Sequence, residues 1–469
     1  TDIAQSSTSV SGGNAAGLGG GGTLVANQFY PQHVNILEVP SRTDVRVVTW
    51  QTTTPTKWNL STVRAIARDY EANHPGWKVI GAINGDFFDI NANRPLPYQT
   101  NGVQVSEGDF FRSVPSNSTV GFTNNGTANS LIGGKTVERE IVLTIYDQEN
   151  NVMDRIQINR HNSTPQAGEV ALYNANWNQD KQIVPVDIAS VIAAEYFVVR
   201  GATKALAGAT NDFYGIGMIT DTTPSVLGEG DFAILSNNAS VNALLSQGVT
   251  IRAQYEIIGD YQEATSLTGA GITLLKDGTL TSQTDVYRHP RTMIGVKEDG
   301  TIIMGVIDGR QPDVNMYGAT QEEMAAMMRH YGAVEAYNLD GGGSSTMLIR
   351  EGNDFRVVNS PSDGRERTDA NAILIVALDP VIDYQASNIS QNELTITANI
   401  TNAHHHDVAK LLIRMNNQTK EVQNGSVTFD NLLPNREYLY EFIIENEQGE
   451  RTKLITQDKQ FSAKRLPYL

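Results

Sequence analysis

The chain has 469 residues, of which 40% are hydrophobic and 19% charged, and its formal net charge is −17. This length suits two or three domains with a sizeable core. The negative charge argues against a nucleic-acid-binding protein, which needs a basic surface to displace counterions, and against docking on an anionic membrane. The chain has no cysteine, which excludes disulfide scaffolds, thiolate zinc sites and cysteine nucleophiles.

The first residues indicate a processed or trimmed chain. It begins at Thr1 instead of Met, which we interpret as the loss of a signal peptide or of other N-terminal sequence. Residues 1–23 are rich in Gly, Ser and Ala and are predicted to form a flexible lead. The longest apolar run, residues 372–378, has the length of a strand and is far below the roughly 18 residues that span a bilayer. We therefore expect no membrane span.

Residues 24–379 are predicted to form an α+β domain with mixed, largely antiparallel sheets and some helices. Apolar spacing predicts a helix over 60–72. A second helix is expected over 320–331, where Thr320 and Glu323 have the spacing of a capping box and Gly332 follows as a stop. Expected strands cover 45–50, 78–84, 141–146, 170–173, 194–199, 232–235, 249–258, 301–307 and 333–339. The unit 301–339 has a strand–helix–strand order that suits parallel strands.

The sequence pattern changes at Asp379-Pro380, after which alternating strands and turns continue to residue 469. Leu433, Pro434 and Tyr438 follow the pattern Leu-Pro-x-x-x-Tyr, and a polar Gly hairpin comes after them. This segment resembles a fibronectin type III domain over about twenty residues. We expect residues 380–469 to form a small all-β sandwich that acts as a spacer or a binding appendage.

Asp340 and the glycines that follow it form the most distinctive motif, AYNLDGGGSSTM over residues 336–347. A carboxylate at the mouth of a strand can meet a substrate, and three glycines allow close approach of the backbone to a ligand. Their N–H groups can form an anion-binding nest. The alternative is a Gly-rich turn without a ligand. A nucleotide P-loop is rejected because the lysine is missing. Ser344 and Ser345 lack the G-x-S-x-G elbow of a hydrolase nucleophile.

Three further clusters combine carboxylates with arginines or aromatic residues. HPRTMIG contains Arg291, and VIDGRQ contains Asp308 and Arg310 at a strand end. Arginine offers bidentate contacts to phosphate oxygens, although Asp-Gly is also a common turn. NSPSDGRER, over 359–367, is either a solvated loop or part of a site. NGDFFD, over 84–89, follows a strand, and its aromatic residues suit either a sugar or the core.

HPRTMIG, VIDGRQ, GAT-x-x-EMA, AYNLDGGGSSTM and NSPSDGRER occur in this order within about eighty residues, and NGDFF lies far upstream of them. The chain resembles the phosphodiester glycosidase family over roughly residues 45–378. GEVALYN at Gly168 and GAGITLLKDG at Gly269 are similar to further family positions. NGDFF departs from the family's NGGFF by Asp86, so the role of this position stays open: sugar choice, a cation, or none.

The resemblance implies a hydrolase that cuts the glycosidic bond of a sugar-1-phosphodiester, typically of α-linked N-acetylglucosamine, and leaves a phosphomonoester. Such a site needs cations or amide donors at the phosphate and a carboxylate near the anomeric carbon. We expect Asp340 and Asp308 as the leading carboxylates, with Asp86 and Glu323 in reserve, although Glu323 also suits helix capping. The expected substrate-binding residues are Arg291, Arg310, Arg367, Gly341, Gly342, Gly343, Ser344, Ser345, Asn84, Asn338, Asn359 and Asp363.

No cofactor is required by the sequence. Asp308, Asp340 and Asp363 would nevertheless suit a hard cation such as Ca²⁺ or Mg²⁺, and their ligand geometry stays open. The three histidines 404–406 are adjacent in the predicted appendage. Alternate side chains of a strand face opposite ways, so we expect these histidines to form an exposed loop instead of a metal site.

The preferred interpretation is a secreted or cell-surface bacterial enzyme acting on phosphoglycans. Two alternatives remain. One is a carbohydrate-binding or adhesion protein that kept the fold and lost catalysis, which the predicted sandwich would suit. The other is an exo-acting hydrolase of a different sugar linkage, in which the arginines bind a carboxylate instead of phosphate. The oligomeric state stays open.

Overall fold

The computed structural model describes residues 3–9, 29–41, 44–54, 57–90, 98–112, 118–124, 129–174, 193–202, 211–223, 226–228, 230–283, 285, 287–351, 353–388, 390–404, 406–434, 436–454 and 461–462. The chain divides into two compact units. Unit 1 comprises residues 1–67, 81–348 and 357–375, and unit 2 comprises 68–80, 349–356 and 376–469. The division falls within α1 (Val63–Asn73), β7 (Trp77–Asn84), β26 (Met347–Glu351), β27 (Asp354–Val357) and β29 (Ala372–Leu378).

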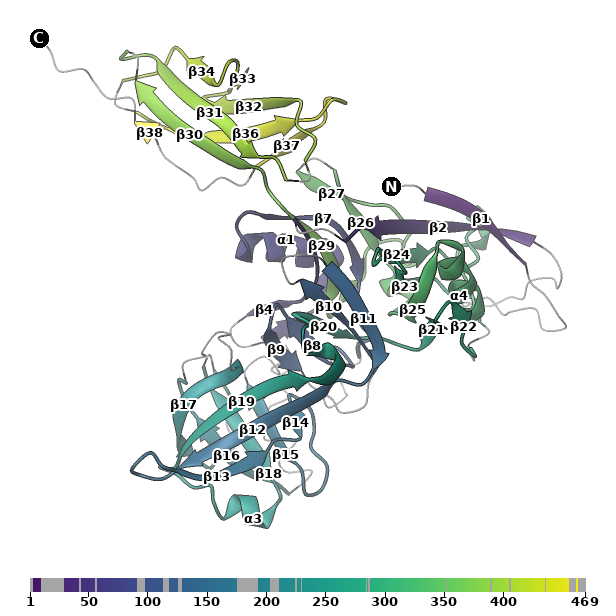
Figure 1. The fold of residues 1–469 in the computed structure, drawn as a ribbon, viewed down its shortest axis with the longest axis vertical. Coiled ribbons are helices and arrows are strands. Elements are labelled where there is room, and N and C mark those ends of the chain that lie inside the picture. Colours follow the sequence, from purple (N-terminus) through teal and green to yellow (C-terminus); the bar gives the residue numbers. More distant parts are fainter. Residues whose placement is uncertain are drawn as a thin grey trace, which may run out of the picture. The chain divides into compact units, whose positions relative to one another are not determined.

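A seven-stranded sheet of unit 1 carries the motifs around Asp308 and Asp340 (Figure 1). Its strands, in spatial order, are β1 (Ile3–Ser9), β2 (Phe29–Val39), β24 (Ile302–Ile307), β23 (Arg291–Lys297), β25 (Ala333–Asn338), β21 (Thr273–Lys276) and β22 (Thr279–Leu280). All neighbours pair antiparallel. Since β23 lies antiparallel between β24 and β25, these two run in the same direction, as the strand–helix–strand pattern predicts.

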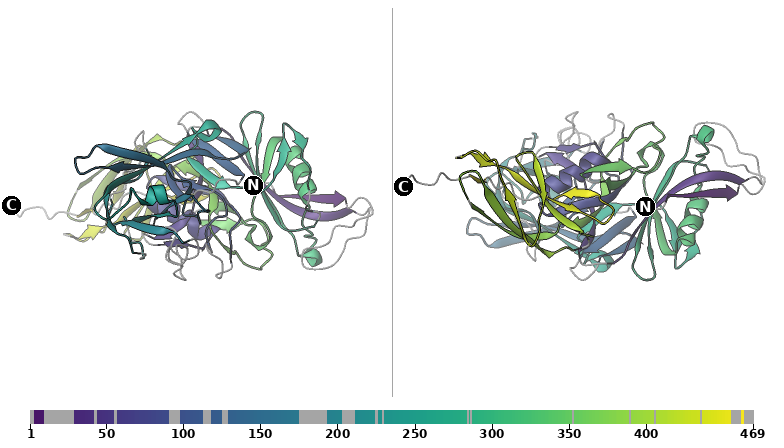
Figure 2. Two further views of the ribbon diagram at one scale, coloured as in Figure 1. Left: turned by 90° about the horizontal axis from the view of Figure 1, so that it is seen from below. Right: turned by 90° about the horizontal axis from the view of Figure 1, so that it is seen from above.

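The expected lead at residues 1–23 requires a correction at its start. Ile3–Ser9 forms β1, which pairs with β2 at the edge of the sheet, and the two strands run side by side in Figure 2. The Gly-rich part, residues 10–23, lies outside the described residues. The sequence of β1 consists mainly of small and polar residues, which suffices for an edge strand because its backbone pairs on one side with a longer neighbour.

Helix α4 (Gln321–His330) packs on this sheet, against β21, β22, β23 and β25. Thr320 accepts a hydrogen bond from the Glu323 backbone N–H, and Glu323 accepts one from the Thr320 N–H, so the capping box is confirmed. Met324 and Met328 are buried among Met293 and other residues of the sheet. Gly332, with φ of +91°, follows the end of the helix.

Two further sheets complete the larger part of unit 1. The five-stranded sheet has the order β11 (Asn129–Lys135), β10 (Thr119–Asn124), β20 (Ser266–Gly269), β8 (Gln104–Ser106), β9 (Asp109–Arg112). The eight-stranded sheet has the order β13 (Val152–Gln157), β12 (Glu138–Tyr146), β19 (Thr250–Ile258), β17 (Asn211–Asp221), β16 (Glu195–Val199), β18 (Phe232–Ser236), β15 (Val170–Asn174), β14 (Arg160–His161). Pairing is antiparallel except between β14 and β15. Val105 and Phe110 share one core with Leu143 and Phe197, so the two sheets pack together.

The remaining elements of unit 1 are short or carry the unit boundary. They are β3 (Val45–Trp50), the pair β4 (Thr52–Thr54) and β5 (Lys57–Asn59), the pair β6 (Ser61–Thr62) and β28 (Thr368–Asp369), the helix α3 (Ala239–Asn242), and the 3₁₀ turns η2 (Gly259–Tyr261), η3 (Pro312–Val314) and η4 (Gly342–Ser344). Every strand that the sequence predicts overlaps an observed strand, and the helix expected over 60–72 is α1. The structure is mostly β-sheet, so α+β overstates the share of helices.

Unit 2 contains two sheets at the C-terminal end of the chain. Their strands are β30 (Val381–Asn388), β31 (Leu394–Asn402) and β34 (Ser426–Phe429), and β33 (Gln418–Glu421), β32 (Lys410–Met415), β36 (Tyr440–Glu445) and β37 (Arg451–Lys453), beside the pair β35 (Glu437–Tyr438) and β38 (Phe461–Ser462). Ile396 and Phe429 of one sheet share a core with Ile413 and Phe442 of the other. The Tyr438 hydroxyl accepts a hydrogen bond from the Leu433 N–H at 2.6 Å, which is the contact of a tyrosine corner.

Candidate active site

Three motif residues lie at one edge of the seven-stranded sheet. Asp308 follows β24, and Asp340 follows β25 after one further residue. Arg291 opens the antiparallel β23 between these two strands and pairs in register with Ile307. Because β24 and β25 run in the same direction, their C-terminal ends and the start of β23 meet at this edge. The strand order, and not closeness in sequence, brings these residues together.

The glycines after Asp340 make room for two guanidinium groups. A Cβ at Gly342 would lie 3.1 Å from both Nη atoms of Arg310. A Cβ at Gly343 would overlap the guanidinium of Arg367 and the carboxylate of Asp363. Gly342 also has φ of +65°, which favours glycine. Close approach is therefore the reason for glycine here, as the sequence predicts, but the groups that approach are arginine side chains.

The backbone amides of this turn mostly have hydrogen-bond partners within the protein. Gly341 N–H donates to Asp340 Oδ1 at 2.9 Å, and Gly342 N–H donates to the Pro290 carbonyl at 2.9 Å. Ser344 N–H donates to the Gly341 carbonyl at 3.3 Å. These three groups are therefore not free for an anion. The expected nest is thus replaced by a turn that supports the arginines.

Asp340 is the carboxyl that faces these arginines. Burial raises its pKa to about 6, while the Ser344 hydroxyl, the Gly341 N–H and the charges of Arg367 and Arg310 lower it. Arg367 is held by Asp363, with 2.9 Å from Nε and 2.8 Å from Nη2 to the carboxylate. Arg310 contacts Nδ1 of His289 through Nη2 at 3.1 Å. Asp340 is therefore ionised at neutral pH, a form that the charges of Arg367 and Arg310 favour.

Asp86 is a further buried carboxyl and is 3% exposed. Its Oδ2 accepts a hydrogen bond from Gly102 N–H at 2.7 Å, and its backbone N–H donates to Asn371. Burial raises its pKa to about 7; hydrogen bonds from backbone N–H groups oppose this, the charge of Asp340 adds to it, and Arg112 lowers it. The residue that departs from the family pattern is therefore electrostatically coupled to the candidate catalytic carboxyl.

Asp308 is 2% exposed and holds the loop that follows β27. Its Oδ1 accepts hydrogen bonds from Asn359 Nδ2 at 3.2 Å and from Ser360 N–H at 2.8 Å. Asn359 in turn donates to the Ser345 carbonyl and accepts from the Met347 N–H. Burial raises the pKa of Asp308 to about 6, against these hydrogen bonds. Asp308 and Asn359 thus fasten the loop that carries Asp363 and Arg367.

The contacts of Arg291 do not support its predicted role in phosphate binding. Its Nε donates to the Ala319 carbonyl at 2.9 Å, and its Nη2 donates to Asp285 at 2.7 Å and to the Tyr287 carbonyl at 2.9 Å. The guanidinium is 7% exposed. Its charge still acts on Arg310, whose pKa is lowered by burial and by Arg367, with a smaller effect of Arg291. Arg310 and Arg367 are better placed than Arg291 for an anionic substrate.

Glu323 serves the helix instead of the site. One carboxylate oxygen completes the capping box, and the other accepts a hydrogen bond from Arg288, which is 1% exposed. Burial raises the pKa of Glu323, and the charge of Arg288 lowers it. Both oxygens are occupied, so the capping alternative explains this residue.

The expected amide and hydroxyl residues mainly order the backbone around Asp340. Asn84 donates to the Asp340 carbonyl at 2.7 Å and accepts from Thr292 and from the Thr346 N–H. The Thr292 and Ser345 hydroxyl oxygens lie 3.2 Å apart, so Ser345 can donate to Thr292. Asn338 is different, because its Oδ1 is buried and has no hydrogen-bond partner among the described residues. Asn338 is the amide most available to a substrate hydroxyl.

The sequence analysis missed Asp369, a carboxyl that is 1% exposed and coupled to Asp340. It also missed His289 and Asn371, which contact Arg310 and the Asp86 backbone. Asp369 lies two residues after Arg367. Extending the NSPSDGRER motif by those two residues would have included it.

Metal binding gains no support from the described part of the chain. No group of three or more His, Cys, Asp or Glu side chains there is arranged to hold a metal ion. Asp308 is bound by Asn359, and Asp363 by Arg367. His405 lies outside the described residues. His406 contacts the Leu378 carbonyl at 3.2 Å.

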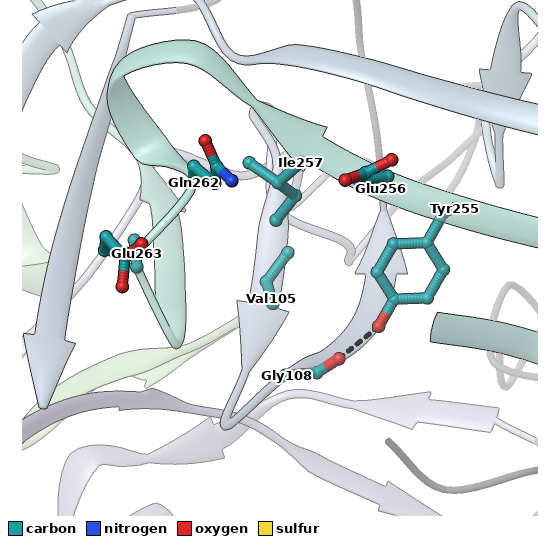
Figure 3. Close-up of a pocket in the computed structure, with 8 residues that line it drawn as sticks. Val105, Gly108, Tyr255, Glu256, Ile257, Gln262 and Glu263 are labelled. Carbon is teal, nitrogen blue, oxygen red and sulfur yellow. Dashed lines mark hydrogen bonds between the residues drawn. The ribbon is translucent and has the colours of Figure 1, made fainter. Parts of the chain in front are cut away.

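A pocket of about 230 Å³ lies elsewhere in unit 1, lined by residues of β8, of β19 and of the segment 262–264 that follows η2 (Figure 3). Tyr255 borders it and donates a hydrogen bond to the Gly108 carbonyl. Its wall also includes Val105, Glu256 and Glu263. None of the predicted site residues lines this pocket. In the described residues no helix is long and apolar enough to cross a membrane.

Comparison with known proteins gives a family match that includes this edge of the sheet. Residues 201–376 match the family model described as phosphodiester glycosidase. A prophage-derived uncharacterised protein of Bacillus subtilis (strain 168), YomE, is 35% identical over 111 residues, which are 22% of this chain and only 16% of that protein. The resemblance inferred from the motifs is confirmed for the matched segment.

Two solved structures share the fold. A hypothetical protein from Synechocystis superposes with a TM-score of 0.54 and 18% identity, covering 78% of this chain and 61% of that one. A protein from Burkholderia pseudomallei K96243 that carries the name of an exported protein has a TM-score of 0.52 and 21% identity, covering 75% of each chain. At these identities the likeness concerns the fold alone.

Proposed function

Because residues 201–376 match the family model described as phosphodiester glycosidase, we propose that this protein hydrolyses the glycosidic bond of a sugar-1-phosphodiester. The observation that carries the proposal is the seating of Arg310 and Arg367 on Gly342 and Gly343, beside Asp340. Two guanidinium groups suit a phosphodiester, and one ionised carboxylate suits an anomeric carbon. We further propose α-linked N-acetylglucosamine as the sugar.

The chemistry follows from where charge develops. When the bond between the anomeric carbon and the phosphate oxygen breaks, its electron pair goes to that oxygen, so the monoanionic diester becomes a dianionic phosphomonoester. Arg310 and Arg367 stabilise this second negative charge. The sugar becomes positive, and the Asp340 carboxylate either attacks it or activates the water that adds to it. Water supplies the new hydroxyl and one proton is released.

The proposed reaction needs little general-acid catalysis, which agrees with the residues present. Phosphate is a good leaving group, so one indispensable carboxylate is enough. Asp308 and Glu323 are occupied by Ser360 and Arg288, respectively. We assign them the positioning of a loop and of a helix. The protein is proposed to work outside the cell on phosphoglycans, in line with the exported neighbour, with its C-terminal sheets as a fibronectin type III-like spacer.

The test is release of free sugar from the methyl phosphodiester of α-N-acetylglucosamine-1-phosphate and from UDP-N-acetylglucosamine. We expect Asp340→Asn and Arg310→Ala to lower kcat/KM by about 10²-fold or more, on the order of 2.7 kcal/mol of barrier. Arg329→Ala, which removes an exposed arginine of α4, is the matched control and should keep wild-type activity. A parallel assay with a chelator tests the metal expectation.

The other outcomes separate the alternatives. Binding of the sugar phosphates without release would favour a carbohydrate-binding protein. Hydrolysis of a sugar linkage that lacks phosphate, with the arginines holding a carboxylate, would favour the exo-acting hydrolase. Equal activity of wild type and Asp340→Asn would contradict the assignment of Asp340.

A further inference from the structure

Asp369 is a buried carboxyl without an evident structural role. It lies in β28, where it pairs with Ser61 of β6, and it is 1% exposed. Neither carboxyl oxygen has a hydrogen-bond partner of ordinary geometry among the described residues. Asp308 and Asp86, the other buried carboxyls of the site, each accept at least one backbone N–H. An ionised carboxylate without donors is strongly disfavoured in the protein interior.

The backbone places Asp369 close to the reacting edge of the sheet. Asn371, two residues further on, accepts a hydrogen bond from Gly85 N–H at 3.2 Å. The Gly85 carbonyl accepts one from Asp340 N–H at 3.1 Å. Asp369 and Asp340 are thus on segments that are joined through one residue. The Ser344 hydroxyl lowers the pKa of both carboxyls.

The charged groups around the pair favour one proton and one charge. Asp369 faces Asp340 and Glu366, which are negative, and Arg367, which is positive. Glu366 is already paired with Arg64 at 3.0 Å, and Arg367 with Asp363 at 2.8 Å. Burial raises the pKa of Asp369 well above its usual range, and the charge of Asp340 adds to this. Asp340 has Arg310, Arg367 and the Gly341 N–H beside it, so it ionises first.

We propose that Asp369 is a positioning residue that acts through Asp340: it stays protonated in the active enzyme, so that Asp340 alone of these two carboxyls carries negative charge. This inference rests on the proposed function. A second charge at Asp369 would repel the substrate phosphate and oppose ionisation of Asp340. The neutral carboxyl instead leaves the guanidinium groups of Arg310 and Arg367 facing a single carboxylate.

The first test measures protonation without requiring any activity. Thermal unfolding of the full chain is compared for wild type and Asp369→Asn at pH 4 and pH 8. An unfolded Asp ionises near pH 4, whereas folded Asp369 keeps its proton, so wild type loses stability as the pH rises above 4. Asn has no proton to lose. We expect Asp369→Asn to melt about 3 °C or more above wild type at pH 8, with a much smaller difference at pH 4.

Two controls keep this test decisive. Asp313→Asn, at an exposed aspartate of η3, should show no such pH-dependent difference. Asp369→Val, which is neutral and similar in volume, replaces the Asn variant should that variant fail to fold. A melting difference that is the same at both pH values, or that favours wild type at pH 8, would show that Asp369 is ionised and would overturn the proposal.

The second test measures the effect on the reaction. We expect kcat/KM of Asp369→Asn to stay within about threefold of wild type at pH 6.5 and to be no lower than wild type at pH 9, because Asn mimics the protonated state. A tenfold loss at pH 6.5 would mean that Asp369 transfers its proton or carries charge, which overturns the proposal. Absence of sugar release by wild type would instead refute the proposed function, while the melting experiment would still decide the protonation of Asp369.

Discussion

Arg367 and Gly343 are in such close contact that no side chain fits at position 343. A Cβ there would overlap the Arg367 guanidinium and the Asp363 carboxylate that holds it. The same turn supports Arg310 against Gly342. Glycine is therefore needed here because it leaves room for both arginines, whose charges act on Asp340.

Gly343→Ala is expected to displace Arg367 without unfolding the protein, because the guanidinium lies at the end of a partly exposed side chain. Losing one preorganised donor to a developing charge costs about 10²-fold in rate, and we expect a loss of kcat/KM between about tenfold and that value. Sugar release and melting temperature are measured together. Gly228→Ala, where the Cβ meets Asp231 at an ordinary 3.4 Å, is the control. Wild-type kcat/KM in Gly343→Ala would refute this arrangement.

The pH dependence of the reaction follows from Asp340. Burial raises its pKa to about 6, and the proposed chemistry needs the ionised form. We expect kcat/KM to be constant above this value and to fall about tenfold per pH unit below it. Two other buried carboxyls compete as the source of such a limb: Asp308, with a pKa raised by burial to about 6, and Asp86, with a pKa raised by burial to about 7. The pH profile of Asp308→Asn should therefore keep the fall in kcat/KM at low pH. Disappearance of this fall in the variant would assign it to Asp308 instead of Asp340.

The sequence predicts this site in outline because each motif contains its own local signal. The strand ends at Asp308 and Asp340 follow from apolar runs that stop at Asp-Gly, and the run of glycines marks close backbone contact. The antiparallel β23 between β24 and β25 then brings the motifs to one edge. The motifs, together with the resemblance to the family, thus nominated Arg310, Asp340 and Arg367, and the structure places these residues near one another.

The partners of each side chain could not be predicted in the same way. Arg291 is held by the carbonyl of Ala319, 28 residues further along the chain, and Asp308 by the N–H of Ser360, 52 residues further along. Such contacts depend on how loops pack, and no local pattern encodes them. Asp369 was missed for a related reason: its burial beside Asp340 depends on the pairing of β28 with β6, two strands that are too short to have a sequence pattern.

A substitution of Glu323 can distinguish a role in helix capping from a role in catalysis. In Glu323→Gln the amide can still accept the Thr320 N–H, but buried Arg288 loses its counter-charge. We expect the free energy of unfolding to fall by about 2 kcal/mol, while kcat/KM, measured well below the melting temperature, stays within about threefold of wild type. A loss of activity by two orders of magnitude at unchanged melting temperature would return Glu323 to the catalytic residues.

Tyr438 gives the corresponding test for the C-terminal sheets of unit 2. Its hydroxyl accepts the Leu433 N–H at 2.6 Å, and the ring is 8% exposed. Tyr438→Phe keeps the ring in the core shared with Phe442 but leaves this N–H without an acceptor, at a cost of about 1 kcal/mol. We expect a lower melting temperature for the transition of unit 2 and unchanged sugar release from a small substrate, because no residue of the candidate site lies in these sheets. Leu439→Ala, at a side chain that is 60% exposed, should change neither. Loss of sugar release in Tyr438→Phe would show that these sheets take part in the reaction and are more than a spacer.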